Sequence, residues 1–357
     1  MTQPEQSPLG PNDELSVRRE LEDHRERLMA LRASATQICE SVLQINSIPF
    51  HSVKSRVKSF PSILEKIIRK KYEPHLFSCT DVVGIRVMCL YPSHVDTIVM
   101  LLGQEFHVLE TVDKRPQSDP ERFGYNSVHL LCRFGGTERA KLPEYASFAG
   151  VTFEIQVRTI LQEAWAEIQH RLVYKSSVAA PNDVKRIIAL LSAHLESADM
   201  HFQDIYQKRE AYVEKLKKAG TPNLEDEPLN IDSLLEILRR HYSWADGWEA
   251  VLGDHLVPRL TELLSELGSA GITTVRQLVQ LIQKWSAETI AASREVYQKS
   301  LTAQDPKSPI AHYYDWQQKT NQFFTPLGHI RSALEREFPG FYEARKKDQE
   351  KEGGSRG

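Results

Sequence analysis

The sequence has few cysteines and no long apolar run. Its 357 residues include four cysteines, and none of them forms a C-x-x-C pair, so we expect neither a zinc site nor a disulfide framework. No apolar stretch reaches the roughly 18 residues that a membrane-spanning helix needs. The N-terminus lacks the basic, apolar and small-residue pattern of a secretion leader. We therefore expect a cytoplasmic protein with no membrane partner.

A strong charge of one sign is also missing. The formal net charge is −3 and 26% of the residues are charged, which gives no overall signature of a nucleic-acid-binding protein. Locally the balance differs, because seven basic residues and only one acid, Glu65, lie between Lys54 and Lys71. Such a cluster suits phosphate, but it is as typical of a solvated helix face. The sequence leaves both interpretations open.

Hydrophobic periodicity predicts two kinds of structure in succession. Residues 50–175 predict an α+β domain around a mixed sheet of about five strands, flanked by helices, and after Pro181 an all-α C-terminal region follows. We expect strands at 81–91, 107–113, 125–134 and 151–159, helices at 14–45, 95–106, 160–175 and 182–218, and a helix beginning at Ser59. The expected division is a disordered start with an N-terminal helix (1–45), the α+β domain (46–180), a helical extension (181–218), a helical domain (219–340) and a disordered tail (341–357).

Alternation in the expected strands collects polar side chains on one face of the sheet. A single strand such as 151–159 carries little weight, because any sheet with one wet face gives the same pattern. Taken together, the strands place an aromatic ring, a histidine, two arginines and two carboxylates on one surface. The side chains concerned are Tyr125, Ser127, His129, Glu154, Gln156, Arg158, Arg86 and, at the start of its strand, Asp81.

That set suits a nucleotide bound with a hard cation. Proteins usually hold Mg²⁺ with one or two carboxylates plus substrate phosphates. Arginines neutralise phosphate and stack on adenine, and a tyrosine can stack on a second base. Asp81 and Arg86 are five residues apart and would point to opposite faces of an ideal strand, so we expect Asp81 just before the strand.

Five motifs, in this order, resemble the RelA/SpoT-type (p)ppGpp synthetase domain. They read RVKSFPSILEKIIRK, DVVGIRV, GYNSVH, FEIQVRT and AWAEIQHRLVYK, over about residues 50–178. The resemblance implies a nucleotidyltransferase-like fold and an ATP-dependent pyrophosphokinase, a GTP diphosphokinase of the stringent response. Such an enzyme moves the β,γ-pyrophosphate of ATP to the ribose 3′-hydroxyl of GDP or GTP, making (p)ppGpp and AMP. Because the chain has no His-Asp pair, we expect a small, synthetase-only member with an extra C-terminal helical region.

The resemblance also implies roles for individual residues. Asp81 and Glu154 would be the catalytic pair and would hold Mg²⁺, with Glu154 as the base for the 3′-hydroxyl. Lys175 could add charge at the rim of the site. The ATP-binding residues would be Arg56, Lys58, Ser59 and Arg86. The acceptor-binding residues would be Tyr125, which stacks on guanine, with His129, Gln156, Arg158, Lys114 and Arg122.

The loop before Tyr125 departs from the family pattern. Family synthetases often read like DYI..PK.NGY, with lysines that hold acceptor phosphates, whereas this chain reads VDKRPQSDPERFGY. The acceptor therefore stays open between GDP or GTP and, as in toxic relatives, an adenine nucleotide or the 3′ end of tRNA. A degenerate, non-enzymatic interaction protein is the third alternative, although the motif residues are all present. The helical C-terminal region would support a homo-oligomer or bind a partner protein.

Overall fold

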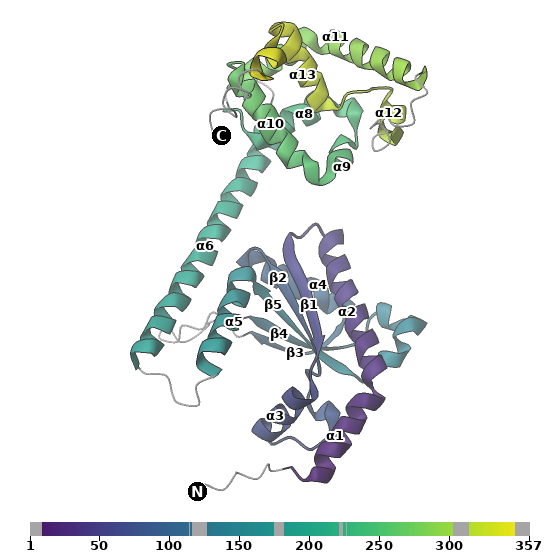
Figure 1. Cartoon of the computed structure of the whole chain (residues 1–357), viewed down its shortest axis with the longest axis vertical. Helices are drawn as coiled ribbons and strands as arrows, with labels where there is room; N and C mark the ends of the chain where they lie inside the picture. Colours follow the sequence, from purple (N-terminus) through teal and green to yellow (C-terminus); the bar gives the residue numbers. More distant parts are fainter. Residues whose placement is uncertain are drawn as a thin grey trace. The chain divides into compact units, whose positions relative to one another are not determined.

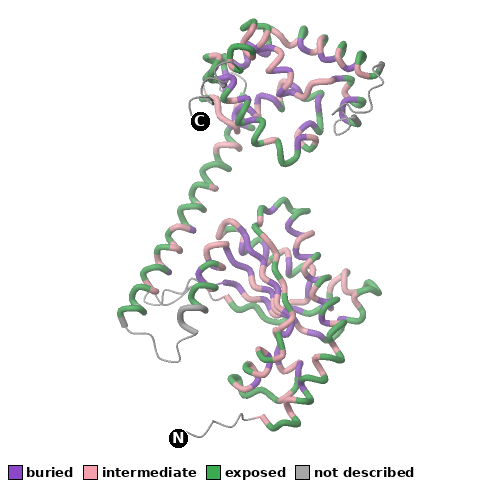
Figure 2. The backbone as a smooth tube through the Cα atoms, in the orientation of Figure 1, coloured by how far each residue is buried: buried purple, intermediate pink, exposed green. Residues whose placement is uncertain are grey.

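The chain folds into two compact units, residues 1–207 and 208–357, whose boundary falls inside helix α6 (Asn182–Lys218). The computed structural model describes residues 9–113, 115, 127–174, 182–220, 224–225, 227–302 and 314–346. Each unit has its own apolar core (Figure 2). No helix in these ranges is long and apolar enough to cross a membrane.

The first unit is built around a mixed sheet of five strands (Figure 1). The strand order is β1-β2-β5-β4-β3, in which β2 and β5 pair in parallel and all other neighbours pair antiparallel. The expected mixed sheet of about five strands is therefore confirmed. The strands are β1 (Phe50–Val57), β2 (Val83–Cys89), β3 (His107–Asp113), β4 (Val128–Arg133) and β5 (Thr152–Thr159).

One face of the sheet is apolar and carries the core of this unit. Ile85 in β2 and Ile155 in β5 are fully buried, and the residues beside them in the sequence are polar or glycine. Helices α2 and α4 pack against these strands, which leaves the polar alternate residues on the other face. The helices are α1 (Pro11–Asp23), α2 (Arg25–Ile45), α3 (Phe60–Lys70), α4 (Pro92–Glu105) and α5 (Ile160–Tyr174), with short 3₁₀ turns η1 (Leu76–Ser78), η2 (Arg139–Lys141) and η3 (Pro143–Phe148).

Two elements of the first unit differ from the expectation. The helix expected at 14–45 is two helices, because the backbone at His24 leaves the helical range, with φ −98° and ψ 2°. Strand β1 was not expected, since its residues are mostly polar and it lies at the edge of the sheet. The position of Asp81 is confirmed: β2 begins only at Val83, so Asp81 lies in the turn before it.

The described part of the second unit is helical around one apolar core, as expected. Thr274 and Gln277 form a capping box at the start of α11 (Val275–Thr302), because the Thr274 amide donates to Gln277 Oε1 at 3.1 Å and the Gln277 amide to Thr274 Oγ1 at 3.4 Å. The buried indole of Trp316 donates to the Ala245 carbonyl at 3.1 Å. The helices are α8 (Ile231–His241), α9 (Trp248–Leu252), α10 (Leu256–Ser269), α11 (Val275–Thr302), α12 (Tyr314–Thr320) and α13 (Pro326–Glu337), with 3₁₀ turns η4 (Ser243–Ala245) and η5 (Gly253–His255).

A buried histidine in this second core should make its stability depend on pH. His329 is fully buried, its ring stacks on Tyr242 at 5.3 Å, and burial lowers its pKa to about 4. The unfolded chain takes up a proton near pH 6.5 and the folded chain does not, so stability is full above pH 6.5 and falls towards pH 4, by about 3 kcal/mol in total. Urea unfolding at pH 7.5 and 5, followed by tryptophan fluorescence, measures this loss. The His329→Phe variant should lose less stability over that range; an equal loss would contradict the account.

Candidate functional site

Strand register brings three predicted site residues and one lysine into a single row across the polar face of the sheet. Lys54 in β1 lies opposite Arg86 in β2, Arg86 opposite Gln156 in β5, and Gln156 opposite His129 in β4. Residues that face one another across neighbouring strands share a face of the sheet, so these four point the same way. Segments more than seventy residues apart in the sequence therefore meet on one surface.

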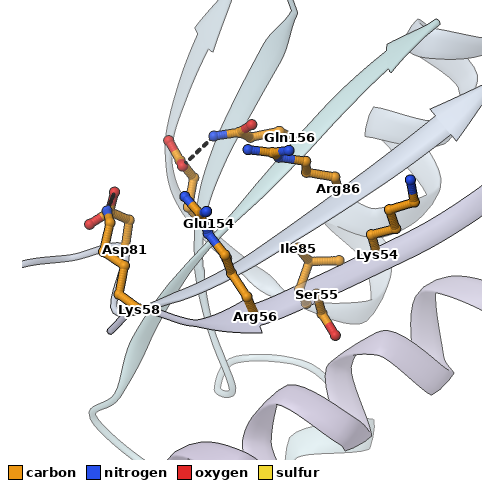
Figure 3. Close-up of a pocket in the computed structure, with 10 residues that line it drawn as sticks. Lys54, Ser55, Arg56, Lys58, Asp81, Ile85, Arg86, Glu154 and Gln156 are labelled. Atoms are coloured by element: carbon orange, nitrogen blue, oxygen red, sulfur yellow. Dashed lines mark hydrogen bonds and ion pairs between the residues drawn. The ribbon is translucent and has the colours of Figure 1, made fainter. Parts of the chain in front are cut away.

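The next row contains an open space. Arg56 lies opposite Gly84, and Gly84 opposite Glu154. A Cβ atom at Gly84 would meet nothing within 4 Å, so the absence of a side chain there leaves room above the sheet. This room belongs to a cavity of about 230 Å³ (Figure 3). Its lining is Lys54, Ser55, Arg56, Lys58, Asp81, Gly84, Ile85, Arg86, Glu154 and Gln156.

Asp81 enters this cavity from the turn before β2 and is held by two lysines. Lys58 donates to its Oδ2, and Lys66 Nζ lies 2.7 Å from its Oδ1. Burial opposes ionisation of this carboxyl, but the hydrogen bonds and charges of both lysines outweigh burial and lower its pKa. Asp81 is therefore a carboxylate at neutral pH, and two ammonium groups lie beside it.

Glu154 is held by its neighbours on the same face. His129 Nδ1 lies 2.7 Å from Glu154 Oε1, and Gln156 Nε2 donates to Oε2 at 2.7 Å. The other ring nitrogen of His129 lies 2.9 Å from Ser127 Oγ. Burial again opposes ionisation, but the bonds from His129 and Gln156 lower the pKa of Glu154 overall. The carboxylate is thus charged at neutral pH and fixed in direction.

An acid that the sequence analysis did not single out joins the two arginines of this face. Glu163, in the first turn of α5, lies 3.0 Å from Arg86 Nη1 and 3.1 Å from Arg158 Nη1. Arg158 also donates to Gln156 Oε1, so a chain of hydrogen bonds runs from α5 across β5 to Glu154 and β4. Glu163 could have been recognised in the sequence as an acid in the first turn of the helix that directly follows the strand with Arg158.

The structure unites most of the predicted site and leaves some residues elsewhere. Of the predicted set, Arg56, Lys58, Asp81, Arg86, Glu154 and Gln156 line the cavity. His129 and Arg158 reach it through their bonds to Glu154 and Gln156. Ser59 lines a neighbouring cavity instead. Tyr125, Lys114, Arg122 and Lys175 lie outside the described residues. Lys66 was also missed, although it belongs to the basic cluster between Lys54 and Lys71.

The carboxylates of the cavity fit a magnesium ion. Asp81 and Glu154 both line it, and they are close enough that the charge of Asp81 acts on the ionisation of Glu154. No group of three or more histidine, cysteine or acidic side chains with metal-binding geometry occurs among the described residues. Two carboxylates alone suit Mg²⁺, which takes its remaining ligands from water and substrate phosphates, better than they suit zinc.

Comparison with known proteins places this chain in one family. Residues 55–179 match the family described as a region found in RelA / SpoT proteins. The chain is 30% identical over 179 residues to the GTP pyrophosphokinase YjbM of Bacillus subtilis, covering 48% of this chain and 81% of that one. It is 32% identical over 143 residues to the GTP pyrophosphokinase YwaC of the same organism, covering 38% of this chain and 64%, just under two thirds, of that one.

Solved structures also resemble part of this chain. The small alarmone synthetase 1 from Bacillus subtilis matches with 26% identity and a TM-score of 0.45, covering 54% of this chain and 97% of that one. With the motifs, the sheet and the carboxylate-lined cavity already described, the extent of the match to YjbM settles the class. The chain belongs to the RelA/SpoT family of pyrophosphokinases.

Proposed function

We propose that the protein is an ATP-dependent pyrophosphokinase that makes (p)ppGpp. It transfers the β,γ-pyrophosphate of ATP to the ribose 3′-hydroxyl of GDP or GTP and releases AMP. The observation that supports this most is the cavity on the polar face, where two carboxylates lie among the cations Lys54, Arg56, Lys58 and Arg86. Pyrophosphoryl transfer requires such a site, because its catalysis depends mainly on positioning and on neutralising phosphate charge.

ATP would lie with its adenine between two arginines. Arg56 and Arg86 come from neighbouring strands, point to the same face and flank the open space at Gly84. Guanidinium groups stack well on flat rings. Arg86 is already held by Glu163, which fixes one side of the proposed slot. Lys58, in the turn before α3, and Lys66, within α3, would face the triphosphate from beside Asp81.

Asp81 and Glu154 would hold Mg²⁺ in this proposal. When bound, the ion would neutralise charge on the β- and γ-phosphates during transfer. The lysines that now pair with Asp81 would then be free to turn towards phosphate oxygens. Lys58, Lys66 and the ion would thus place three positive groups near the leaving α-phosphate and the transferred pyrophosphate.

The proton of the 3′-hydroxyl would pass to Glu154 as the new bond forms. The 3′-oxygen attacks the β-phosphorus of ATP, the bond from that phosphorus to the α–β bridging oxygen breaks, and AMP leaves with that oxygen. The bonds from His129 and Gln156 hold the Glu154 carboxylate in one direction, which supports this role. Its lowered pKa means that Glu154 is a weak base that acts through position.

The acceptor is assigned to the neighbouring part of the same face. Gln156, Arg158 and His129 would border it, Tyr125 would stack on its base, and Lys114 with Arg122 would contact its phosphates. Acceptor profiling tests this: release of AMP from ATP and Mg²⁺ is measured with GDP, GTP, ADP or tRNA added. Release that needs a guanine nucleotide supports the proposal. Transfer of γ-phosphate label to tRNA, or to an adenine nucleotide alone, would replace it with the toxic-relative alternative.

Filling the space at Gly84 should weaken ATP binding and leave the fold intact. Gly84 lies inside β2 without a positive φ, and a Cβ there meets no atom within 4 Å. We expect Gly84→Val to raise the KM for ATP about tenfold or more, because it occupies the adenine slot, while thermal stability stays equal or rises slightly. Steady-state kinetics and a melting curve measure both effects. Gly84→Ala, a smaller group, should give a smaller rise; an unchanged KM in the valine variant would place ATP elsewhere.

The remaining parts of the proposal concern location and assembly. We propose that the protein is cytoplasmic and that its C-terminal helical region, 219–340, supports a homo-oligomer or binds a partner protein. Size-exclusion chromatography with light scattering on the full chain tests the oligomer; a monomer at micromolar concentration would leave a partner protein as the expected role.

A further inference from the structure

A second, basic cavity lies beside the proposed ATP pocket. It measures about 410 Å³ and is formed by α1, α2 and the turn from β1 into α3. Its charged lining consists of five cations and one acid: Arg18, Arg25, Arg32, Arg56, Lys58 and Glu22. Leu21, Met29, Val57 and Phe60 supply apolar wall. The proposed reaction uses Arg56 and Lys58 but leaves the three other arginines without a role.

The three arginines are placed by the geometry of the two N-terminal helices. Arg25 and Arg32 are seven residues apart on α2, so they lie on one face of it and roughly 10 Å apart along its axis. Arg18 comes from α1, before the break at His24, and its guanidinium lies 4.4 Å from the centre of the Phe60 ring. This contact holds Arg18 over the start of α3. Figure 1 shows α1 and α3 beside one another at this end of the unit.

Four of the five cations of this cavity lack an ion-pair partner among the described residues, whereas Lys58 pairs with Asp81. Within the described ranges, no carboxylate lies within ion-pair distance of Arg18, Arg25, Arg32 or Arg56. Arg27, on another side of α2, differs from the cavity arginines because its guanidinium donates to the backbone carbonyl oxygens of Ser147 and Ala149. Among the described residues, the cavity arginines have no such bonds, so their donors are available to a ligand.

We propose that this cavity is a second anion site that binds the polyphosphate chain of a small molecule without a metal ion. Arginine forks match phosphate oxygens two at a time, and several of them around one space favour an anion with more than one phosphate. The carboxylate pair that would hold Mg²⁺ belongs to the other cavity, so binding here needs no divalent cation. The volume suits a nucleotide or a short inorganic polyphosphate. Because Arg56 and Lys58 line both cavities, an anion in one changes the charge that faces the other.

Calorimetric titration of the full chain with inorganic tripolyphosphate, in EDTA and near-physiological salt, tests this site independently of catalysis. We expect one bound anion per chain. In the double variant Arg25→Gln/Arg32→Gln, the affinity should fall by about tenfold or more. The control Arg19→Gln/Arg336→Gln removes the same charge from exposed helix positions outside both cavities and should bind like the wild type. Arg86→Gln, which alters only the first cavity, should also keep its affinity.

Three results would overturn the proposal. The first is no tripolyphosphate binding to the wild type, including the case in which a single-stranded oligonucleotide binds instead. The second is unchanged affinity in Arg25→Gln/Arg32→Gln. The third is an equal loss in Arg86→Gln, which would put the anion in the ATP pocket. A melting curve for each variant shows that it is folded, and Arg25→Lys/Arg32→Lys, which keeps the charge, should bind between the wild type and the glutamine variant. If tripolyphosphate binds as expected, repeating the titration with ATP in EDTA tells a nucleotide ligand from inorganic polyphosphate.

Discussion

Replacing Glu154 with glutamine is expected to lower kcat for pyrophosphate transfer about a thousandfold, within the range that a positioned acid–base group supplies. The change removes the carboxylate that would take the 3′-hydroxyl proton and one of the two proposed magnesium ligands. The amide keeps the shape of the side chain, and its oxygen can still accept a bond from His129 or Gln156. Thermal stability should therefore change little. Single-turnover formation of AMP, measured against a melting curve, separates the two effects.

A surface carboxylate is the matched control for this variant. Glu138 is about nine-tenths exposed and, among the described residues, pairs only with the exposed Lys141, so Glu138→Gln should have wild-type activity. If Glu154→Gln retained more than about a tenth of the wild-type kcat, Glu154 would be neither base nor essential metal ligand. The proton would then have to leave by another route, and the bonds of His129 to Glu154 and Ser127 would need another explanation.

Replacing Asp81 with asparagine is expected to affect magnesium use and stability together. The variant loses a metal ligand, so the Mg²⁺ concentration that half-saturates activity should rise, and kcat should fall about a hundredfold or more. It also leaves Lys58 and Lys66 facing one another without their shared carboxylate. Both side chains are about one-sixth exposed, so we expect a loss of about 1–3 kcal/mol in the free energy of unfolding. A magnesium titration of AMP release and urea unfolding at neutral pH measure these changes.

Asp96→Asn gives the comparison for Asp81→Asn. Asp96 lies on α4, is about two-thirds exposed, and pairs with Arg115 outside the cavity. Its loss should leave both the magnesium dependence and the stability near those of the wild type. An Asp81→Asn protein with an unchanged magnesium dependence would show that the metal binds without Asp81. If the variant were also as stable as the wild type, the ion pairs of Asp81 with Lys58 and Lys66 would contribute nothing to the free energy of unfolding.

Much of the polar face could be predicted from the sequence because strand alternation is a local property. The alternation of 151–159 put Glu154, Gln156 and Arg158 together, and the register of β5 with β2 and β4 brings Arg86 and His129 beside them. Sequence alone did not show that β1 carries Arg56 as part of the sheet, because an edge strand with polar residues has almost no hydrophobic signal.

The connections between elements could not be predicted in the same way. Glu163 meets Arg86 and Arg158 only because α5 starts at the end of β5 and turns its first residues over the sheet. Lys66 reaches Asp81 only through the way α3 packs beside the turn before β2. Both contacts depend on how a helix leaves a strand, which periodicity does not specify. The contacts of His129 depend on strand register, which periodicity does not specify either. The family resemblance implied that His129 binds the acceptor, whereas in the structure its ring nitrogens contact Glu154 and Ser127.

The central claim is that the pyrophosphate of ATP moves to a guanine nucleotide at the cavity between β1, β2 and β5. The most direct measurement incubates the purified full chain with γ-labelled ATP, Mg²⁺ and GDP, and separates the products by chromatography and mass. The account predicts AMP and a labelled guanosine 3′-pyrophosphate in equal amounts from the wild type, and almost none from Glu154→Gln. No AMP at all, ADP in its place, or equal product from the Glu154→Gln variant would contradict it.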